Sequence, residues 1–228
     1  MTDTDTGRSD GRRLGADEAG KGPVLGPMVA GAVRAVSSAL PAGIDDSKRL
    51  DADERERLAA TMRDDDRIET ATAAVGTDEI DDPETDMNEL TVLAQARALA
   101  TVARDGDRAV VDAGDVSESR FGRRVTAAVA AEGGAEVDVT ATHGADERDA
   151  VVAAASVLAK VERDRRIAAV DAEHDRDVGS GYPSDPTTRA FLADYVDEHG
   201  SLPPAARASW QTAADVLAAA EQSGLDEF

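Results

Sequence analysis

The spacing of apolar residues changes several times along the chain, and each spacing predicts a different kind of element. Alternating or continuous apolar positions predict strands over residues 13–17, 28–36, 67–75, 108–111 and 136–141. Helical spacing predicts helices over residues 51–62, 86–104, 121–131, 146–174, 186–199 and 209–222. Strands alternate with helices first and helices accumulate later, which indicates an α/β sheet followed by a helical C-terminal part.

The composition excludes several classes of protein. The chain has 228 residues and no Cys, which removes disulfides, thiolate zinc sites and thiol nucleophiles. No apolar run reaches about 18 residues, so we expect no membrane span. The first residues are polar and acidic, unlike a signal peptide. We therefore expect a cytoplasmic protein.

Acidic residues greatly outnumber basic ones, 47 to 25, for a formal charge of −22. A nucleic-acid partner usually requires a basic patch. However, an Asp-rich sequence with Lys only at 21, 48 and 160 is typical of proteins from a salt-loaded cytoplasm. At about 1 M salt the Debye length is ~3 Å, so a distant acidic surface barely repels phosphate. We favour this halophile interpretation over a generic acidic protein.

The segment 15–23, with sequence G-A-D-E-A-G-K-G-P, has two competing interpretations. The first is a phosphate loop, since the segment nearly matches G-x-x-x-x-G-K-[ST]. Gly22, however, replaces the hydroxyl residue that should hold Mg²⁺, and Pro23 opposes the helix that should follow. These two departures disfavour a phosphate-loop nucleotide hydrolase.

The second interpretation of this segment is a metal site. Asp17 and Glu18 are adjacent carboxylates at the end of a strand, and they repel each other unless a cation lies between them. Gly20 and Gly22 let the backbone approach a ligand closely. A solvated acidic turn is the alternative that composition alone favours. The Gly-rich, Pro-bounded surroundings favour the metal site.

Further distinctive segments follow downstream: Asp46-Ser47-Lys48, Asn88-Glu89-Leu90, Val111-Asp112, Ala145-Asp146-Glu147 with Ala153–Val161, and Gly179–Pro186. Together with D-E-A-G-K-G-P, they resemble in the same order the motifs of the ribonuclease HII family, especially its archaeal members. The resemblance spans the chain from Leu14 to about Trp210. Six motifs in one order are far more specific than any single motif.

The resemblance implies a ribonuclease H-like fold, with a five-stranded mixed sheet flanked by helices and a helical C-terminal segment. It suggests a disordered tail over residues 1–13, a catalytic domain over 14–178 and the helical segment over 179–228. It also implies an endoribonuclease that cleaves the RNA strand of RNA–DNA hybrids and single ribonucleotides embedded in duplex DNA. The expected products carry 5′-phosphate and 3′-hydroxyl ends.

The metal-binding acids of the family fall on Asp17, Glu18, Asp112 and Asp146. We expect them to hold two divalent ions, Mg²⁺ or Mn²⁺, for which oxygen ligands are suited. Two ions about 4 Å apart can activate a water and stabilise a leaving oxygen. Taken singly, Asp112 is more typical of a strand-end turn and Asp146 of a helix N-terminus than of a metal site. The complete motif set favours the metal roles.

The resemblance also implies substrate contacts. The backbone of Gly20, Lys21 and Gly22 should meet the 2′-hydroxyl that separates RNA from DNA. The family's usual Arg is Lys21 here, so a phosphate contact survives while any bidentate contact is lost. Tyr182 should stack on the neighbouring sugar. A loop aromatic that closes the core is the alternative for Tyr182.

Four further residues are candidates for contacts with the substrate or with the acids. Ser47 and Lys48 should contact phosphate, with a mobile loop as the alternative. Asn88 should reach the substrate backbone, with an ordinary helix start as the alternative. Ser156 and Lys160 lie four residues apart on one helix face, where they could orient the acids. For Lys160 we favour simple neutralisation of the acidic charge.

Several residues depart from the family pattern or from ligand spacing. Gly144 stands where archaeal members usually carry Lys, so one positive charge near the site is missing. His143, His174 and His199 show no ligand spacing. We expect His143 to be peripheral and the other two to lie on the surface.

The expected partners are RNA–DNA hybrid and ribonucleotide-containing duplex DNA, with no membrane and a monomeric protein. A sliding clamp is a further candidate partner, but the end Leu225-Asp226-Glu227-Phe228 shows no convincing clamp-binding peptide. A non-catalytic hybrid-binding module of the same fold is the main rival. The four intact acids argue against that module, because binding alone does not need them.

Overall fold

The computed structural model describes residues 11–44 and 50–226. Its contacts divide the chain into two compact units. Of the described residues, the first unit holds 11–19, 29–44, 50–74 and 91–162, and the second holds 20–28, 75–90 and 163–226. The predicted boundary between residues 178 and 179 divides the chain at one point, whereas each of these two units combines several segments of the chain. The predicted boundary stays a prediction.

A five-stranded sheet forms the first unit, in the order β3-β2-β1-β4-β5. Strand β1 pairs antiparallel with β2 and parallel with β4, and β4 pairs parallel with β5. The predicted mixed sheet is therefore confirmed. The strands are β1 (Arg13–Ala19), β2 (Met28–Ala35), β3 (Ile68–Val75), β4 (Arg108–Asp112) and β5 (Asp138–Thr142).

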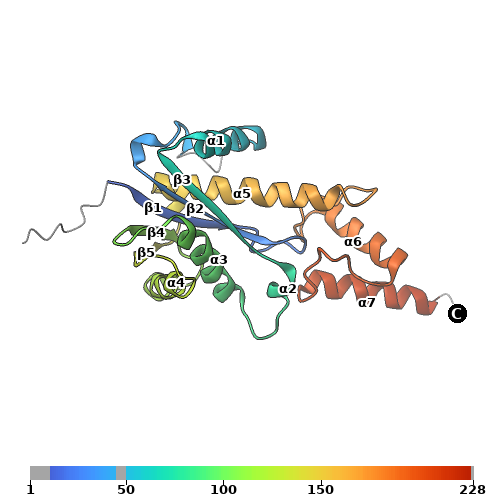
Figure 1. The fold of residues 1–228 in the computed structure, drawn as a ribbon. Helices are drawn as coiled ribbons and strands as arrows, with labels where there is room; N and C mark the ends of the chain where they lie inside the picture. The colour runs from blue at the N-terminus through green and yellow to red at the C-terminus, as the bar shows by residue number, and fades with distance from the viewer. Residues whose placement is uncertain (1–10, 45–49, 227–228) are drawn as a thin grey trace, which may run out of the picture. The chain divides into compact units, whose positions relative to one another are not determined.

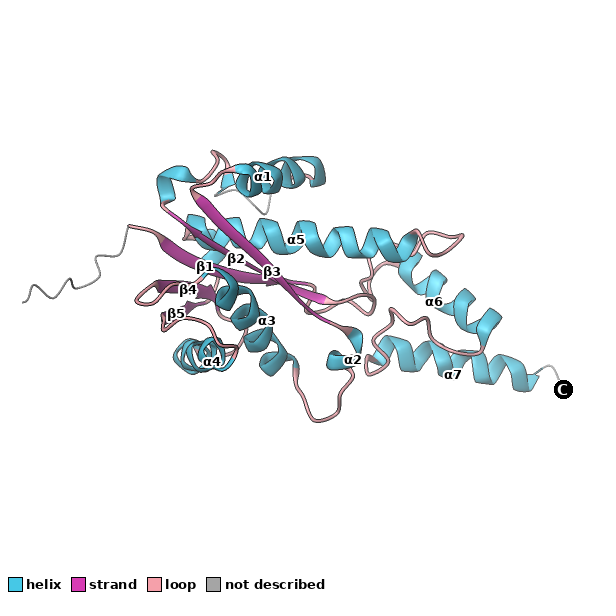
Figure 2. Ribbon diagram, viewed as in Figure 1, coloured by secondary structure: helices cyan, strands magenta, loops and turns pink. Residues whose placement is uncertain are grey.

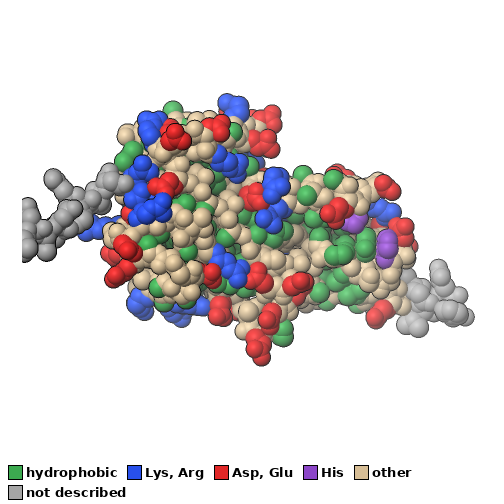
Figure 3. All heavy atoms as spheres, viewed as in Figure 1, with side chains coloured by type: hydrophobic (Ala, Val, Ile, Leu, Met, Phe, Trp, Pro, Cys, Tyr) green, Lys and Arg blue, Asp and Glu red, His purple; other side chains and the backbone are tan. Residues whose placement is uncertain are grey.

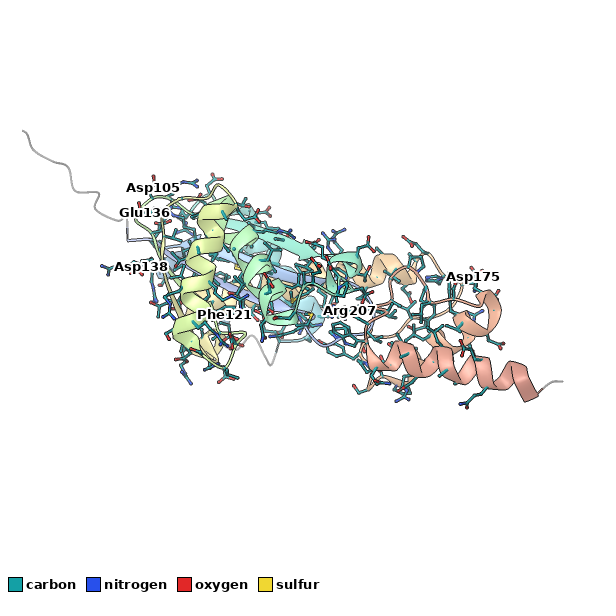
Figure 4. The ribbon with its side chains drawn as sticks, turned by 90° about the horizontal axis from the view of Figure 1, so that it is seen from below. Asp105, Phe121, Glu136, Asp138, Asp175 and Arg207 are labelled. Carbon is teal, nitrogen blue, oxygen red and sulfur yellow. The ribbon has the colours of Figure 1, made fainter. Side chains whose placement is uncertain are left out.

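Helices cover both faces of this sheet, with α1 and α5 on one face and α3 and α4 on the other (Figure 1). Phe121 of α4 is fully buried and is labelled in the view from below (Figure 4). The helices are α1 (Ala52–Asp64), α3 (Met87–Val102), α4 (Glu118–Ala131) and α5 (Ala150–Asp171). Apolar side chains of α1, β2 and α5 pack together into one buried cluster.

Two glycines let α5 approach the sheet closely. A Cβ placed on Gly31 of β2 would lie 2.3 Å from the carbonyl oxygen of Ala155. A Cβ on Gly15 of β1 would lie 2.8 Å from the backbone of Val151. Such distances are far inside van der Waals contact, so only glycine fits at these positions. This close packing fixes the position of β1 relative to α5, and β1 carries Asp17 and Glu18.

Local capping explains where several elements begin. Asp51 accepts a hydrogen bond from the Glu54 amide (2.8 Å) and forms a capping box with that residue at the start of α1. Asp185 accepts one from the Thr187 amide (2.9 Å) ahead of Pro186, the first residue of α6. Both helix starts were predicted, and both are confirmed.

The predicted single helix over residues 146–174 is wrong at its start. A short 3₁₀ helix, η3 (Ala145–Glu147), comes first, and α5 begins only at Ala150. Gly144 precedes η3 with a φ of 62°, in the left-handed region. The Asp149 carboxylate accepts a hydrogen bond from the Val151 amide (3.0 Å) and so occupies the helix N-terminus in place of Asp146.

The second unit consists mainly of helices and loops (Figure 2). Its helices are α2 (Thr77–Ile80), α6 (Pro186–His199) and α7 (Gln211–Asp226), and α6 packs against α7. Its core is a small apolar cluster that includes Leu25, Ile167, Val178 and Phe191. Among the residues that the structure describes, no helix is long and apolar enough to cross a membrane.

Candidate active site

Asp17 and Glu18, near the end of β1, are buried to different extents. Asp17 is 6% exposed, whereas Glu18 is half-buried. The Glu18 amide donates to Asp17 Oδ1 (2.7 Å), and the Ser156 hydroxyl also hydrogen-bonds this carboxylate. Burial, followed by the charges of Glu18 and Asp112, raises the pKa of Asp17 well above its ordinary value, and the hydrogen bond from Ser156 opposes the rise.

Asp112 ends β4, beside the end of β1. Ala16 pairs with Val111 in the parallel register of these two strands, so the next residues, Asp17 and Asp112, stand on neighbouring strand ends. The Ala145 amide donates to Asp112 Oδ1 (2.7 Å). The charge of Asp112 also raises the pKa of Asp17, as expected for carboxylates on neighbouring strand ends. The sheet topology therefore brings together Asp17, Glu18 and Asp112.

Asp146 lies in η3, which contacts β4, and its side chain is 8% exposed. Because the Ala145 amide bonds to Asp112, the chain just before Asp146 is fixed to the end of β4. A buried charged carboxylate needs a compensating partner. This position is compatible with the predicted metal role of Asp146, which stays a prediction.

Gln95 of α3 connects two of the acidic strand ends and was not predicted as a site residue. It is fully buried, and its Nε2 donates to Glu18 Oε2 (2.6 Å) and to the Asp112 carbonyl oxygen (3.0 Å). Its Oε1 is buried with no hydrogen-bond partner among the described residues. The signal was present in the sequence, since Gln95 lies at helical spacing from the apolar residues Val92 and Leu99.

The acids suit divalent cations chemically, because they are hard oxygen ligands and their mutual repulsion is relieved by a cation. Among the described residues, no group of three or more acidic, His or Cys side chains is arranged to hold a metal ion directly. Asp17 and Asp112 accept hydrogen bonds from backbone amides, and Glu18 accepts one from Gln95. Each of these bonds engages one oxygen of its carboxylate, so the other oxygen stays available to a cation.

Ser156 and Lys160 occupy successive turns of α5, and both are half-buried. The hydrogen bond between Ser156 and Asp17 is the kind of contact predicted for an orienting residue. Lys160 lies one turn further along the same helix. Its neutralising role stays a prediction, as does any metal-orienting role of Ser156.

The loop that follows β1 belongs to the second unit. Gly20 has a φ of +90°, in the region that favours glycine, and residues 21–27 are not helical. A phosphate loop needs a helix at this point, so the structure argues against that alternative. Lys21 Nζ donates to Asn88 Oδ1 (3.3 Å), which brings together two of the predicted substrate contacts.

Tyr182 lies in the loop before α6 and is 37% exposed. The Arg163 guanidinium lies 5.1 Å from the centre of its ring. This exposure does not fit an aromatic that closes the core, the alternative considered for Tyr182. The predicted Ser47 and Lys48 contacts lie outside the described residues.

The histidines form no metal-ligand group with acids or with one another among the described residues. His143 Nε2 lies 2.7 Å from the Asp115 carbonyl oxygen. His199 is exposed and stacks on Tyr195, with ring centres 4.1 Å apart. His174 is half-buried rather than simply at the surface, because its ring packs 4.9 Å from that of Phe191.

Comparison with known proteins points to one family. The family model described as ribonuclease HII matches residues 14–213. The chain is 60% identical to the ribonuclease HII of Halobacterium salinarum over 95% of this chain and 99% of that protein. This relative from a halophile supports the halophile interpretation of the charge.

Solved structures agree with the sequence comparison. The ribonuclease H2 of Pyrococcus horikoshii matches with a TM-score of 0.83 and 34% identity, covering 92% of this chain and 99% of that one. The ribonuclease HII in a PCNA complex from Archaeoglobus fulgidus matches with a TM-score of 0.76 and 33% identity, covering 88% and 95%. The predicted ribonuclease H-like fold is thereby confirmed. The chain belongs to the ribonuclease HII family and is a hydrolase, an endoribonuclease that acts on RNA–DNA hybrids.

Proposed function

We propose that the chain also cleaves at single ribonucleotides embedded in duplex DNA, and that it does so with two divalent ions held by Asp17, Glu18, Asp112 and Asp146. The observation that carries this proposal is the meeting of three carboxylates at the neighbouring ends of β1 and β4, with Asp17 buried among like charges. Isolated acids on a solvated surface would not need such an arrangement.

Bound Mg²⁺ or Mn²⁺ would supply an activated water and would stabilise the leaving oxygen, which gives 5′-phosphate and 3′-hydroxyl products. The chain itself supplies the oxygen ligands and their orientation. Ser156 steadies Asp17 and the Ala145 amide steadies Asp112. Gln95 holds Glu18 by a hydrogen bond from α3, which covers the face of the sheet opposite to α5.

We assign recognition of the ribonucleotide to the backbone of Gly20, Lys21 and Gly22, with Tyr182 stacking on the adjacent sugar. The Lys21–Asn88 hydrogen bond (3.3 Å) supports a shared contact of these two residues with phosphate, because it keeps the ammonium group beside the Asn88 carboxamide. Ser47 and Lys48 remain proposed phosphate contacts. Lys160 remains proposed as a neutralising charge close to the acids.

We expect a monomer in the cytoplasm. A sliding clamp is a candidate partner because the Archaeoglobus fulgidus relative was solved in a PCNA complex. Co-elution with a purified archaeal clamp on a sizing column would support that partner. Separate elution at micromolar concentrations would count against it.

The test is cleavage of a duplex that contains one ribonucleotide, compared between Asp112→Asn and the control Asp115→Asn. Asp115 lies three residues further along but pairs with Arg120 (2.6 Å), so it should be dispensable for the chemistry. We expect Asp112→Asn to lose at least about 100-fold in rate, while the control retains its activity. Cleavage by Asp112→Asn at the normal rate would sink the two-metal assignment.

Metal binding can be measured separately from cleavage. Adding Mn²⁺ should raise the melting temperature of the unmodified protein, because a ligand that binds only the folded state stabilises it. Asp17→Asn should lose this rise. A rise of equal size in Asp17→Asn would show that the ion binds elsewhere.

A further inference from the structure

Two arginines of the second unit are among the largest fully buried side chains of the protein. Arg207 is 0% exposed and Arg163 is 2% exposed. Arg207 comes from the loop before α7 and is labelled in Figure 4. Burial, followed by repulsion from Arg163, lowers the pKa of Arg207 to about 10. The group stays charged at neutral pH, so two neighbouring cations are buried at a considerable desolvation cost.

The partners of Arg207 are backbone carbonyls of a single loop. Its Nη2 donates to the Gly20 oxygen (2.6 Å), its Nη1 to the Lys21 oxygen (3.1 Å) and its Nε to the Gly26 oxygen (2.9 Å). One planar guanidinium therefore fixes three peptides of the loop that follows β1. A guanidinium can do this because its donors form a rigid fork, which an ammonium lacks.

The neighbouring residues complete this support. Trp210 donates from Nε1 to the Gly22 oxygen (3.2 Å), and its ring lies 4.9 Å from the Arg207 guanidinium. The Arg207 amide also donates to the Val24 oxygen (2.8 Å). Each of the three carbonyls from Gly20 to Gly22 is thus turned toward Arg207 or Trp210.

The direction of these carbonyls decides the direction of the amides. The chain has no cis peptide bond among the described residues, so each carbonyl points opposite to the N–H of the next residue. Since the Gly20 and Lys21 carbonyls point at buried Arg207, the N–H groups of Lys21 and Gly22 point away from it. Lys21 is half-buried and Gly22 is exposed.

We propose that Arg207 is the positioning residue that makes the chain discriminate a ribonucleotide from a deoxyribonucleotide. It acts by holding the Lys21 and Gly22 amides in the direction of the 2′-hydroxyl, with Trp210 as its support. This inference rests on the proposed assignment of the Gly20–Gly22 backbone to ribonucleotide recognition. A site built to hydrogen-bond a hydroxyl strongly rejects the analogue that lacks it.

The loop has two roles, discrimination of the ribonucleotide and affinity for phosphate, and these depend on different residues. Because Arg207 orients the backbone, the direction of the amides does not depend on the side chain at position 21. Lys21 then contributes phosphate affinity but no discrimination. We therefore expect Lys in place of the family's usual Arg at position 21 to leave ribonucleotide recognition intact.

The test measures binding of two duplexes of the same sequence, one with a single ribonucleotide and one entirely of DNA. Fluorescence anisotropy without divalent metal, in about 1 M KCl, avoids cleavage and screens the acidic charge. The quantity of interest is the ratio of the two dissociation constants. The variants are Arg207→Lys, Arg207→Met and Lys21→Ala.

The matched control is Arg34→Met. Arg34 is also a buried arginine, but it bonds Asp107 (2.7 Å) and Glu69 (2.9 Å) in the first unit. It reports the general effect of losing a buried guanidinium. Melting temperatures of all variants show whether any loss of binding follows from unfolding.

We expect the ratio to fall about tenfold or more in both Arg207 variants, since hydrogen bonds that involve a charged group are lost. Lys21→Ala should weaken binding of both duplexes equally, and Arg34→Met should leave the ratio unchanged. An unchanged ratio in folded Arg207→Lys would overturn the inference. If the unmodified protein itself shows no preference, the proposed recognition by this loop fails instead.

An NMR measurement covers the case in which Arg207→Met does not fold. The ¹⁵N-labelled amides of Lys21 and Gly22 should shift in Arg207→Lys and stay in place in Arg34→Met. Unshifted amides in Arg207→Lys would contradict the positioning role, whatever the binding data show.

Discussion

At the scale of single residues, neutral donors hydrogen-bond the acids of the site. Asp17 accepts hydrogen bonds from a backbone amide and from the Ser156 hydroxyl. Glu18 accepts one from a carboxamide, and Asp112 accepts one from a backbone amide. Neutral donors orient carboxylates without adding a positive charge that would cancel theirs. Gln95 is the donor that reaches both strand ends.

Gln95→Met tests this role. The change keeps most of the volume but removes the donor to Glu18, and we expect the apparent Mn²⁺ affinity to fall about 10- to 100-fold. The affinity is measured from the dependence of melting temperature on Mn²⁺ concentration. A melting temperature that drops equally with and without Mn²⁺ would mean that Gln95 serves the core alone.

Asp185 has a pH-dependent role at the start of α6. Hydrogen bonds from the Ser180 hydroxyl and from the Ser180 and Thr187 amides lower its pKa from 3.8 to about 2. A lowered carboxyl pKa stabilises the fold above pH 3.8, and this contribution is lost as the pH falls through about 2. The charged form is therefore the stabilising one.

Asp185→Asn should accordingly melt at a lower temperature than the unmodified protein above pH 4, with a gap that narrows as the pH falls toward 2. Thermal melts across this range measure the gap. A gap that stays constant with pH would rule out the charge as the source of the stability.

At the scale of elements, the contact of α5 with β1 and β2 depends on small residues. Gly15 and Gly31 face α5, whose buried face includes Ala153, Ala154 and Ala155. Protein cores are closely packed and rarely have room for an added methyl group. The same contact brings Ser156 of α5 to Asp17 of β1.

Gly31→Ala should therefore destabilise the protein by about 1–3 kcal/mol, because its Cβ would overlap the Ala155 carbonyl oxygen at 2.3 Å. Thermal or denaturant unfolding gives the value. Gly76→Ala is the control, since a Cβ there would meet no atom within 4 Å. Equal stability of the two variants would show that α5 shifts without cost.

At the scale of the whole molecule, the dominant property is the formal charge of −22. Acidic side chains are scattered over the face shown in Figure 3 rather than gathered in one patch. Repulsion among these acidic side chains is therefore spread over many weakly interacting pairs, and salt screens such pairs effectively. We therefore expect the stability of the fold to depend on the salt concentration of the solvent.

Melting temperature and cleavage rate should both rise between dilute buffer and about 1 M KCl, where the Debye length falls to ~3 Å. Sucrose in place of KCl separates screening from general exclusion of solute, and we expect sucrose to be the less effective of the two. Full stability and activity in dilute buffer would refute the halophile interpretation.

The sequence by itself determined the starts of α1 and α6 and the family, because capping residues and ordered motifs are local along the chain. The mixed sheet followed from the resemblance to the family and not from periodicity. The sequence also predicted which acids should act. It missed the break between η3 and α5, where Asp149 and Gly144 compete with a continuous helix.

Only the tertiary structure decided which donors hold those acids and what supports the loop after β1. Gln95 lies 77 residues from Glu18, and Arg207 lies 187 residues from Gly20. No local pattern encodes such pairs, since both side chains resemble ordinary residues until the fold buries them. Burial is what makes their hydrogen bonds specific, because a buried polar group must find its partner inside the protein.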